Sequence, residues 1–409
     1  MPLNRRSLLA ASLAALPVAA DSGRPTVDSG QSESRRLFFV SNGQTVMIRA
    51  DGSEQKPLSF DVPNQAAWQA SGMLPGGRKA LLLSLEPATF GPDRPYDRYF
   101  WQTRTHLWTY DLKTGKLDEV AAQGRMASFY TPQLIVSADR VLMQVARQTG
   151  VQIYSMNLDG SDPVEFTRLG EGVPYGFSLS PDRSQVAFHL AANGYQIYIS
   201  RPDGRERRLI DSQSGHLYFG PAWSPDGRRL AYHDCVPAQD PGHDTSDVRI
   251  ADVAGPVRRG LTSDFPLWFA ATYGNPRRRG SGSNMVSWSR TGEVLCSRRM
   301  PGSRVAWEYQ VGRPDTDHFN REFNLERARG GSFLCRIHPD TGEWKALTPA
   351  KVGRWDFRVT ESPDGRHIAF CRADTGGLPS LWVMDSDGRN ARKISEGLDG
   401  AGCDHPRWL

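Results

Sequence analysis

Several patterns that carry common chemistries are missing from this chain of 409 residues. It has no G-x-S-x-G elbow for a nucleophilic serine, and neither a phosphate loop nor a dinucleotide fingerprint. Basic residues cluster only at 277–279, and no nucleic-acid recognition motif is present. These absences argue against serine hydrolases, nucleotide-binding enzymes and partners made of nucleic acid.

Cysteines and long apolar runs are also scarce. The 5 cysteines form no C-x-x-C pair, which excludes a zinc knuckle. Cys296 and Cys335 fall on neighbouring strands of one predicted repeat, where they could form a disulfide in an oxidising compartment or remain buried thiols. No apolar run reaches the roughly 18 residues that a membrane helix needs, so we predict no integral membrane segment. The net charge of +5 permits an acidic partner without requiring one.

The first twenty residues have the pattern of an export signal. Arg5 and Arg6 precede a short Ala/Leu run that ends at Val18-Ala-Ala20. This pattern is typical of a twin-arginine signal, here residues 1–20. Residues 21–34 are rich in Ser, Gly and Asp, and we expect a disordered tail there. The sequence therefore predicts a periplasmic or secreted protein whose folded domain spans residues 35–409.

Repeated turn motifs determine the predicted fold. WSPDG stands at Trp223–Gly227, WSRTG at Trp288–Gly292, SPDG at Ser362–Gly365 and LSPD at Leu179–Asp182. Each lies between two apolar strands, and a third strand follows that ends in an Asp-Gly type of hairpin turn. Four short strands that recur about every 40 to 50 residues are the signature of a β-propeller.

Seven such copies can be counted, so we predict an all-β fold: a seven-bladed β-propeller of four-stranded antiparallel blades. The first copy lacks its first strand, and the chain ends in an unpaired strand at Asp404–Leu409. If this C-terminal strand completes the N-terminal blade, the ring closes and no sheet edge stays open.

Long insertions are predicted to gather at one end of the ring, where second strands lead to third strands and blades are joined. They cover residues 86–105, 235–246, 262–283 and 299–331. Loops of this length in a compact repeat protein usually bind something. Their aromatic and arginine side chains suit a sugar that carries an acid group, although they could equally form small cores of the loops themselves. The predicted substrate-binding residues are Tyr99, Trp101, Trp268, Tyr273, Asn284, Trp307 and Arg321.

The first strands are predicted to begin at the same end of the ring with polar residues. His216 and His405 are distant in sequence but could approach each other across the channel mouth. Imidazole and carboxylate groups together suit a divalent cation, so His216, Asp404 and His405 are the predicted metal ligands, with manganese or calcium as the ion. Histidines that only bond to neighbouring loops are the alternative.

The predicted catalytic residues would act on a uronate. Such a reaction needs a cation that neutralises the carboxylate and a base that removes the adjacent proton. Arg358, or a metal held by His216 and His405, would neutralise the carboxylate. His243 or His318 would be the base, and Tyr218 the proton donor.

The repeats resemble those of the TolB-like family of propellers, also described as WD40-like or PD40-type, over essentially all of the predicted mature chain. The resemblance implies the fold but leaves the function open, since such repeats also occur in periplasmic protein-binding propellers and in oligogalacturonate lyases. Gly215-His216-Leu217-Tyr218 and Asp404-His405-Pro406 resemble the histidine-bearing first strands of those lyases. That family implies a manganese ion held by histidines and proton removal next to a uronate carboxylate. Its His-Pro-His element has only a partial counterpart, because Arg407 follows Pro406 here.

Two functions remain open at this point. One is an exported lyase that cleaves uronate-containing oligosaccharides by β-elimination, with or without a metal. The other is a non-catalytic TolB-like propeller that binds a protein or glycan partner in the periplasm. A monomer is expected in both cases.

Overall fold

The computed structural model describes residues 35–42, 44–86, 105–122, 130–147, 150–191, 195–236, 245–258, 260–263, 266, 274–275, 278–279, 284–309 and 321–409. Regular structure in these ranges is β-strand, apart from two short 3-10 helices, η3 (Leu325–Arg327) and η4 (Leu398–Gly400). The predicted all-β class is thus confirmed for the described residues. None of their helices has the length and apolar character needed to span a bilayer.

Five separate sheets have four strands each. The first joins the two ends of the described chain: β1 (Arg36–Ser41), β2 (Gln44–Arg49), β3 (Lys56–Pro57) and β32 (Asp404–Trp408). The second comprises β4 (Ala66–Met73), β5 (Lys79–Leu85), β6 (Thr105–Asp111) and β7 (Leu117–Ala122). The third comprises β8 (Tyr130–Ile135), β9 (Arg140–Arg147), β10 (Gly150–Asn157) and β11 (Val164–Glu165).

The other two four-stranded sheets come from the C-terminal half. One comprises β22 (Ser287–Trp288), β23 (Val294–Arg299), β26 (Ser332–Ile337) and β27 (Trp344–Ala346). The other comprises β28 (Arg354–Glu361), β29 (His367–Asp374), β30 (Ser380–Asp385) and β31 (Arg392–Ser395).

A larger, eight-stranded sheet consists of two four-strand units. The first unit is β12 (Val173–Leu179), β13 (Val186–Ala191), β14 (Tyr195–Ser200) and β15 (Arg208–Asp211). The second is β16 (Leu217–Trp223), β17 (Arg229–Val236), β18 (Thr245–Asp252) and β19 (Val257–Arg258). A single parallel pair, Tyr195 with Leu217, links the units. Two small hairpins complete the described strands: β20 (Gly274–Asn275) with β21 (Arg278–Arg279), and β24 (Trp307–Tyr309) with β25 (Arg321–Phe323).

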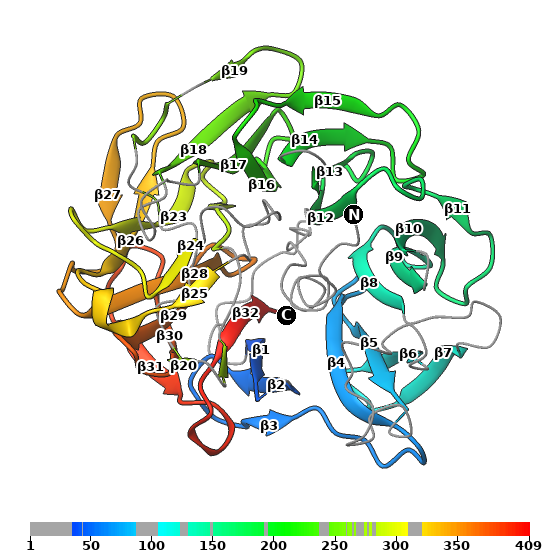
Figure 1. Cartoon of the computed structure of the whole chain (residues 1–409). Coiled ribbons are helices and arrows are strands. Elements are labelled where there is room, and N and C mark those ends of the chain that lie inside the picture. The colour runs from blue at the N-terminus through cyan, green and yellow to red at the C-terminus, as the bar shows by residue number, and fades with distance from the viewer. Residues whose placement is uncertain are drawn as a thin grey trace.

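The sheets stand around a common centre, with β4, β8, β12 and β16 nearest to it (Figure 1). We call the first strand of each unit, including β22, β28 and β32, its inner strand. The last strand, β32, pairs antiparallel with the first, β1, from Leu37 opposite Trp408 to Val40 opposite Asp404. The two ends of the described chain therefore share one sheet.

The repeated motifs have structural roles at the ends of the inner strands. In WSPDG the Ser224 hydroxyl donates to Asp226 over 2.6 Å and accepts the backbone N–H of Arg229 over 2.9 Å, which fixes the turn between two strands. The indole N–H of Trp223 donates to the carbonyl of Ser178 on the preceding inner strand, over 3.2 Å.

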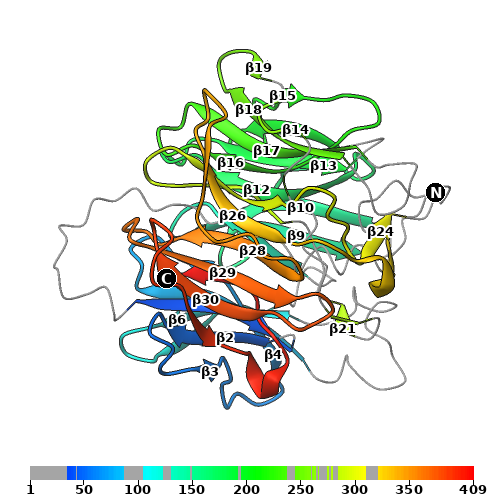
Figure 2. The ribbon, with the colours of Figure 1, turned by 90° about the vertical axis from the view of Figure 1, so that its left-hand side faces the viewer.

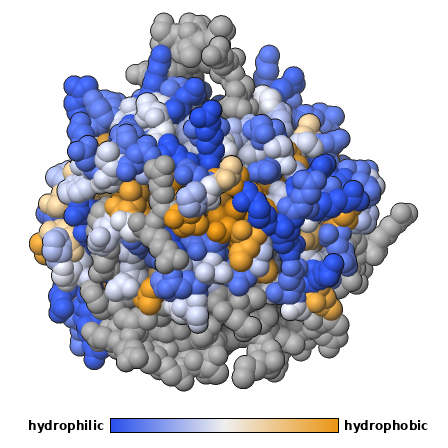
Figure 3. All heavy atoms as spheres, turned by 90° about the horizontal axis from the view of Figure 1, so that it is seen from above, coloured by the Kyte–Doolittle hydropathy of each residue, from blue (hydrophilic) through white to orange (hydrophobic). Residues whose placement is uncertain are grey.

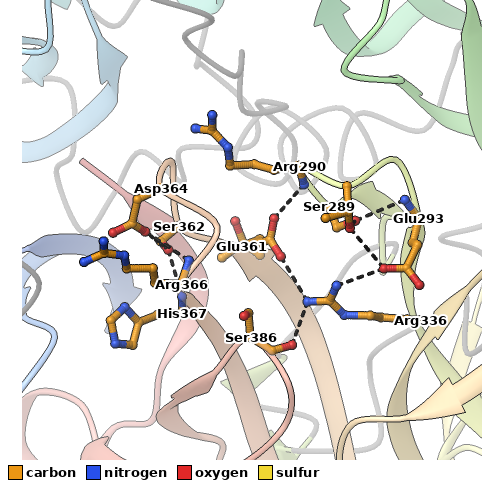
Figure 4. Close-up of polar contacts among 12 residues, drawn as sticks. Ser289, Arg290, Glu293, Arg336, Glu361, Ser362, Asp364, Arg366, His367 and Ser386 are labelled. Carbon is orange, nitrogen blue, oxygen red and sulfur yellow. Dashed lines mark hydrogen bonds and ion pairs between the residues drawn. The ribbon is translucent and has the colours of Figure 1, made fainter. Parts of the chain in front are cut away.

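Equivalent indole bonds join other neighbouring inner strands. Trp288 donates to the Ala222 carbonyl over 2.9 Å, and Trp408 to the Thr360 carbonyl over 3.1 Å. In β28, Glu361 occupies the position of the tryptophan. Its carboxylate accepts the Arg290 backbone N–H over 2.7 Å and pairs with Arg336 over 3.2 Å (Figure 4). The tryptophans and this ion pair thus link neighbouring sheets.

The two hairpins mark one side of the molecule. In the side view, β21 and β24 lie on the same side, and the C-terminal end of β32 lies on the other (Figure 2). These hairpins belong to the insertions at residues 262–283 and 299–331. Their described parts agree with the prediction that insertions share one end.

Apolar side chains fill the spaces between sheets. One buried cluster includes Leu134 and Ile153 from one sheet and Phe177 and Phe188 from the next. On the face shown in Figure 3, apolar atoms gather near the middle of the view, with hydrophilic atoms around them. The exposed large apolar side chains among the described residues lie apart in sequence, as at Leu169 and Leu209, which is ordinary for a protein surface.

All five cysteines are free and buried. Cys296 and Cys335 stand directly opposite each other on β23 and β26, with their sulfur atoms 3.6 Å apart. The predicted proximity is therefore present, and the pair is in its thiol form.

Candidate functional site

The inner strands share an irregularity near the end at which they begin. Pairing with the second strand skips between Tyr175 and Ser178 in β12, and β16, β28 and β32 skip at the equivalent point. A bulge of this kind re-aims side chains and is common beside functional sites. In each of these strands one bulge residue has a positive φ: Gly176 (62°), Gly220 (65°), Arg358 (57°) and His405 (51°).

Steric crowding explains why two of these positions carry glycine. A Cβ on Gly176 would lie 2.8 Å from Nδ1 of His189, and one on Gly220 would lie 2.3 Å from the sulfur of Met285. The same position carries Arg358 in β28 and His405 in β32, where the left-handed conformation costs about 1–2 kcal/mol per residue. Such strain is concentrated at functional sites. This pair of adjacent inner strands is therefore the first candidate for a site.

Arg358 and His405 meet at one carboxylate. Nε of Arg358 lies 3.0 Å from Oδ1 of Asp404. The same oxygen accepts the backbone N–H of His405 over 2.8 Å, and Nδ1 of His405 lies 3.3 Å from Oδ2. Burial, and then the charge of Arg358, lower the pKa of His405, so its imidazole is neutral near pH 7. The strands thus bring three predicted residues into direct contact.

Asn284, a predicted substrate-binding residue, has a structural contact in this cluster. Its side chain is buried, and its Oδ1 accepts the backbone N–H of Arg358 over 2.9 Å. This hydrogen bond comes from the chain next to the neighbouring sheet and holds the backbone of Arg358, which has a positive φ.

Arg407, two residues after His405, was missed by the sequence reasoning. It extends from β32 toward β4, where its Nη1 lies 3.4 Å from the Ser71 carbonyl oxygen. Burial lowers the pKa of Arg407 to about 10, so the guanidinium is charged at neutral pH. No described carboxylate lies within ion-pair distance of it. Its place in the His-Pro-Arg element was the available signal.

A second cluster lies at the beginning of β16. His216 directly precedes this strand, and its Nδ1 lies 2.7 Å from Oδ1 of Asp234. The other oxygen of Asp234 pairs with Nη2 of Arg249 over 2.7 Å, and Nη1 of Arg249 pairs with Asp211 over 2.7 Å. The Tyr232 hydroxyl donates to the same oxygen of Asp211 over 2.8 Å. We call these five residues the His216 network.

The hydrogen bonds of the His216 network orient the imidazole. Burial raises the pKa of Asp234, while the bond from His216 and the charge of Arg249 oppose that effect. When Nδ1 of His216 donates to Asp234, the lone pair of the imidazole is on Nε2, where it can accept a proton as a general base does.

Four members of the network were not predicted, although the sequence contained a signal for Asp234 and Arg249. Asp234 shares a strand face with Tyr232, and Arg249 shares one with Ala251, because alternate residues of a strand point the same way. Tyr232 and Ala251 belong to one buried cluster. Opposite charges on the buried faces of neighbouring strands therefore indicated an internal ion pair.

The predicted role of Tyr218 is not compatible with its position. Its side chain is fully buried in the cluster that contains Tyr232, and its ring faces the Arg249 guanidinium, with Cζ 4.7 Å from the ring centre. A group that protonates a substrate must reach it, so Tyr218 is removed from the candidate site.

Several predicted residues cannot be placed. His243, His318, Tyr99, Trp101, Trp268 and Tyr273 lie outside the described residues. Trp307 and Arg321 are described only by their backbone in β24 and β25, where they pair with Phe323 and Tyr309.

The predicted metal ligands do not form a cation site in the described part of the chain. It contains no group of three or more His, Cys, Asp or Glu side chains that could hold a metal ion. His216 is bonded to Asp234, whereas His405 and Asp404 lie beside Arg358. The charges of Arg358 and Arg407 also lower the pKa of His405, and the same repulsion would oppose a divalent cation.

Comparisons with known proteins show what this chain is similar to. No family model matches the sequence. The Tol-Pal system protein TolB of Bordetella pertussis is 27% identical over 200 residues, which cover 48% of this chain and 34% of that protein. Oligogalacturonate lyase of Dickeya dadantii is 34% identical over 79 residues, or 19% of this chain and 20% of that protein. The chain thus spans about a third of the TolB relative's length.

One solved structure supports the fold over most of this chain. A puromycin hydrolase mutant complexed with PGG has a TM-score of 0.54 and 17% identity, covering 94% of this chain and 55% of that chain. An oligogalacturonate lyase in complex with manganese has a TM-score of 0.34 and 16% identity, covering 86% and 73%. The chain resembles the TolB-like propellers, and more weakly the oligogalacturonate lyases.

Proposed function

We propose that this chain is an exported, closed seven-bladed propeller that cleaves an acidic oligosaccharide by β-elimination at the end where its inner strands begin. The five separate sheets and the two halves of the eight-stranded sheet support seven blades. The pairing of β32 with β1 supports closure by the C-terminal strand. The basic pair Arg5-Arg6 supports twin-arginine export.

The bond between His216 and Asp234 is the observation that carries the proposal. At 2.7 Å, Asp234 orients the imidazole and fixes its tautomer, so that Nε2 of His216 can take a proton. His216 is partly exposed, with a side-chain exposure of 17%, while Asp234 is buried at 8%. An accessible imidazole on a buried carboxylate is the arrangement that general base catalysis requires.

Arginine side chains on β28 and β32 supply the positive charge that β-elimination needs in addition to a base. Removal of the proton at C5 of a uronate places negative charge on the carboxylate side of the sugar. Arg358 and Arg407 carry fixed positive charges on neighbouring inner strands, where they would stabilise that charge. Asp404 holds Arg358 in place through the 3.0 Å ion pair.

The reaction balances without a further reactant. His216 takes the proton from C5, and the electrons of that bond form a C4–C5 double bond. The bond from C4 to the glycosidic oxygen breaks, and this oxygen takes a proton that the imidazolium returns. The products are a new reducing end and an unsaturated uronate that absorbs ultraviolet light.

The test is an ultraviolet assay of the purified protein on fragments of pectin, ulvan and gum arabic. The wild type is expected to form an unsaturated product on at least one substrate, and His216→Ala is expected to lose this activity while keeping the wild-type melting temperature. Full activity of His216→Ala would remove His216 as the base. No product from the wild type on any fragment would remove the lyase proposal.

A non-catalytic propeller is the second candidate. It is favoured by the similarity to TolB, which extends over 200 residues, against 79 residues for the lyase. In this case the same end of the ring would bind a protein or glycan partner in the periplasm. Binding of the acidic fragments without any unsaturated product would select this candidate.

A further inference from the structure

We propose that Arg407 is the binding residue for the carboxylate of an acidic ligand, and that this site works without a metal ion. The inference rests on the proposed function for the class of ligand, a uronate. It does not depend on whether the ligand is cleaved.

The first support is that no carboxylate among the described residues pairs with Arg407. Most arginines that are partly buried in the described residues have one: Arg249 pairs with Asp211 and Asp234, and Arg372 with Asp356. The only described polar contact of Arg407 is the Ser71 carbonyl, at 3.4 Å. A cation that is partly buried and has no counter-charge is less favourable than one fully in water. A bound anion would remove this cost.

The second support is the position of Arg407. It lies on the inner strand β32 opposite Phe38, and it reaches toward the inner strand β4 of the next sheet. Arg407 remains partly exposed, so a ligand can approach the guanidinium. Arg358 lies on the neighbouring inner strand β28 and contacts Asp404, three residues before Arg407, over 3.0 Å. Among the described residues, Asp404 pairs with Arg358 and no carboxylate pairs with Arg407.

The third support is the chemistry of the substitution. The lyase family implies a His-Pro-His element at a metal ion, whereas this chain has His405-Pro406-Arg407. A guanidinium cannot ligate a metal ion, since it has donors and no lone pair to offer. It presents a fixed positive charge with paired N–H donors that match a carboxylate. Arg407 can therefore supply the charge that a cation supplies elsewhere.

The experiment measures binding of trigalacturonate by isothermal titration calorimetry, with EDTA present. The wild type is expected to bind trigalacturonate and to bind its fully methyl-esterified form at least about ten-fold more weakly, because the ester has no charge. Arg407→Gln is expected to lose about 10- to 100-fold in affinity, since hydrogen bonds to charged groups contribute about 1.5–3 kcal/mol. Arg205→Gln is the matched control, because this arginine is 80% exposed and outside the site, and it is expected to bind like the wild type.

A variant that fails to fold is handled by a second substitution. If Arg407→Gln melts below the assay temperature, Arg407→Lys is measured in its place; it keeps the charge and loses the paired donors. We expect it to fold and to bind trigalacturonate more weakly than the wild type by about ten-fold.

The outcomes separate the two proposals. Wild-type affinity of Arg407→Gln or of Arg407→Lys would overturn the role of Arg407. Binding by the wild type that disappears in EDTA and returns with manganese would overturn the metal-free site. Loss of affinity in the Arg407 variants together with the absence of any unsaturated product from the wild type would confirm the site and refute only the cleavage. If the wild type does not bind trigalacturonate at all, the assigned ligand class is wrong.

Discussion

Replacement of Trp408 tests whether the C-terminal strand closes the ring. The side chain is 6% exposed and belongs to a buried cluster with Leu37 and Phe39 of β1 and Leu381 of β30. Its indole N–H donates to the Thr360 carbonyl of β28 over 3.1 Å. Trp408 therefore contacts the first sheet and the last one at the point where the two ends of the chain meet.

The structure sets the expected size of the effect. Trp408→Ala removes a buried aromatic side chain, which costs about 3–5 kcal/mol. Trp408→Phe keeps most of the ring volume and removes the hydrogen bond, which contributes about 0.5–1.5 kcal/mol. Trp344→Ala is the control: this tryptophan is 44% exposed on β27, and its loss is expected to cost less than half as much as that of Trp408.

The assay is equilibrium urea unfolding followed by far-ultraviolet circular dichroism, because fluorescence would itself change with the tryptophan. The expected order of stability is wild type, then Trp408→Phe, then Trp408→Ala. If Trp408→Ala unfolds at the same urea concentration as the wild type, β32 does not hold the ring together and closure by the C-terminal strand is wrong.

Three further predictions concern buried groups. Burial lowers the pKa of His233 to about 4, so this imidazole stays neutral in the folded protein at a pH where the unfolded chain takes up a proton. The contribution of His233 to the free energy of unfolding is therefore full above pH ~6.5 and falls as the pH drops toward 4. At pH ~4.5 the loss for this group is about 2–3 kcal/mol. Urea unfolding at pH ~6.5 and pH ~4.5 should show a smaller change in the free energy of unfolding for His233→Gln than for the wild type. Equal changes in the two proteins would contradict the lowered pKa of His233. Tyr218→Phe keeps the buried ring and should leave turnover of uronate fragments within about two-fold of the wild type; a loss beyond about ten-fold would restore Tyr218 as a proton donor. The hydrogen bond to Cys335 and burial raise the pKa of Cys296, and all five thiols are buried. A thiol reagent should therefore react with none of them in the folded protein and with all five in urea. Rapid labelling of the folded protein would refute this packing.

Local turn chemistry was the part of the fold that the sequence revealed. Ser224 and Asp226 form their bonds within the turn itself, so the motif is the same wherever two strands need this connection. The tryptophan before the turn recurs for another reason, since it bonds to the inner strand of the preceding unit. Repeated local structure is therefore visible in a single sequence.

The site was harder to predict because bulges and contacts between sheets determine it. We expected the residues of an inner strand to face the channel, but strand side chains alternate between two neighbouring sheets. Tyr218 consequently lies in a core, whereas His405 and Arg358 stand at bulges where the alternation is interrupted. A glycine at the bulge signals a positive φ in β12 and β16. In β28 and β32 the equivalent residues are Arg358 and His405, so no glycine in those strands signals the left-handed conformation.

The most direct test of the account compares two isosteric variants of the His216 network. Asp234→Asn removes the carboxylate that orients His216, whereas Asp211→Asn disturbs the same Arg249 from its other side and leaves the bond to His216 in place. The measurement is the initial rate of unsaturated product from trigalacturonate in EDTA. We predict that Asp234→Asn loses about 100-fold or more, because the general base His216 loses the carboxylate that orients it, while Asp211→Asn stays within about ten-fold of the wild type. A wild-type rate for Asp234→Asn would contradict the account.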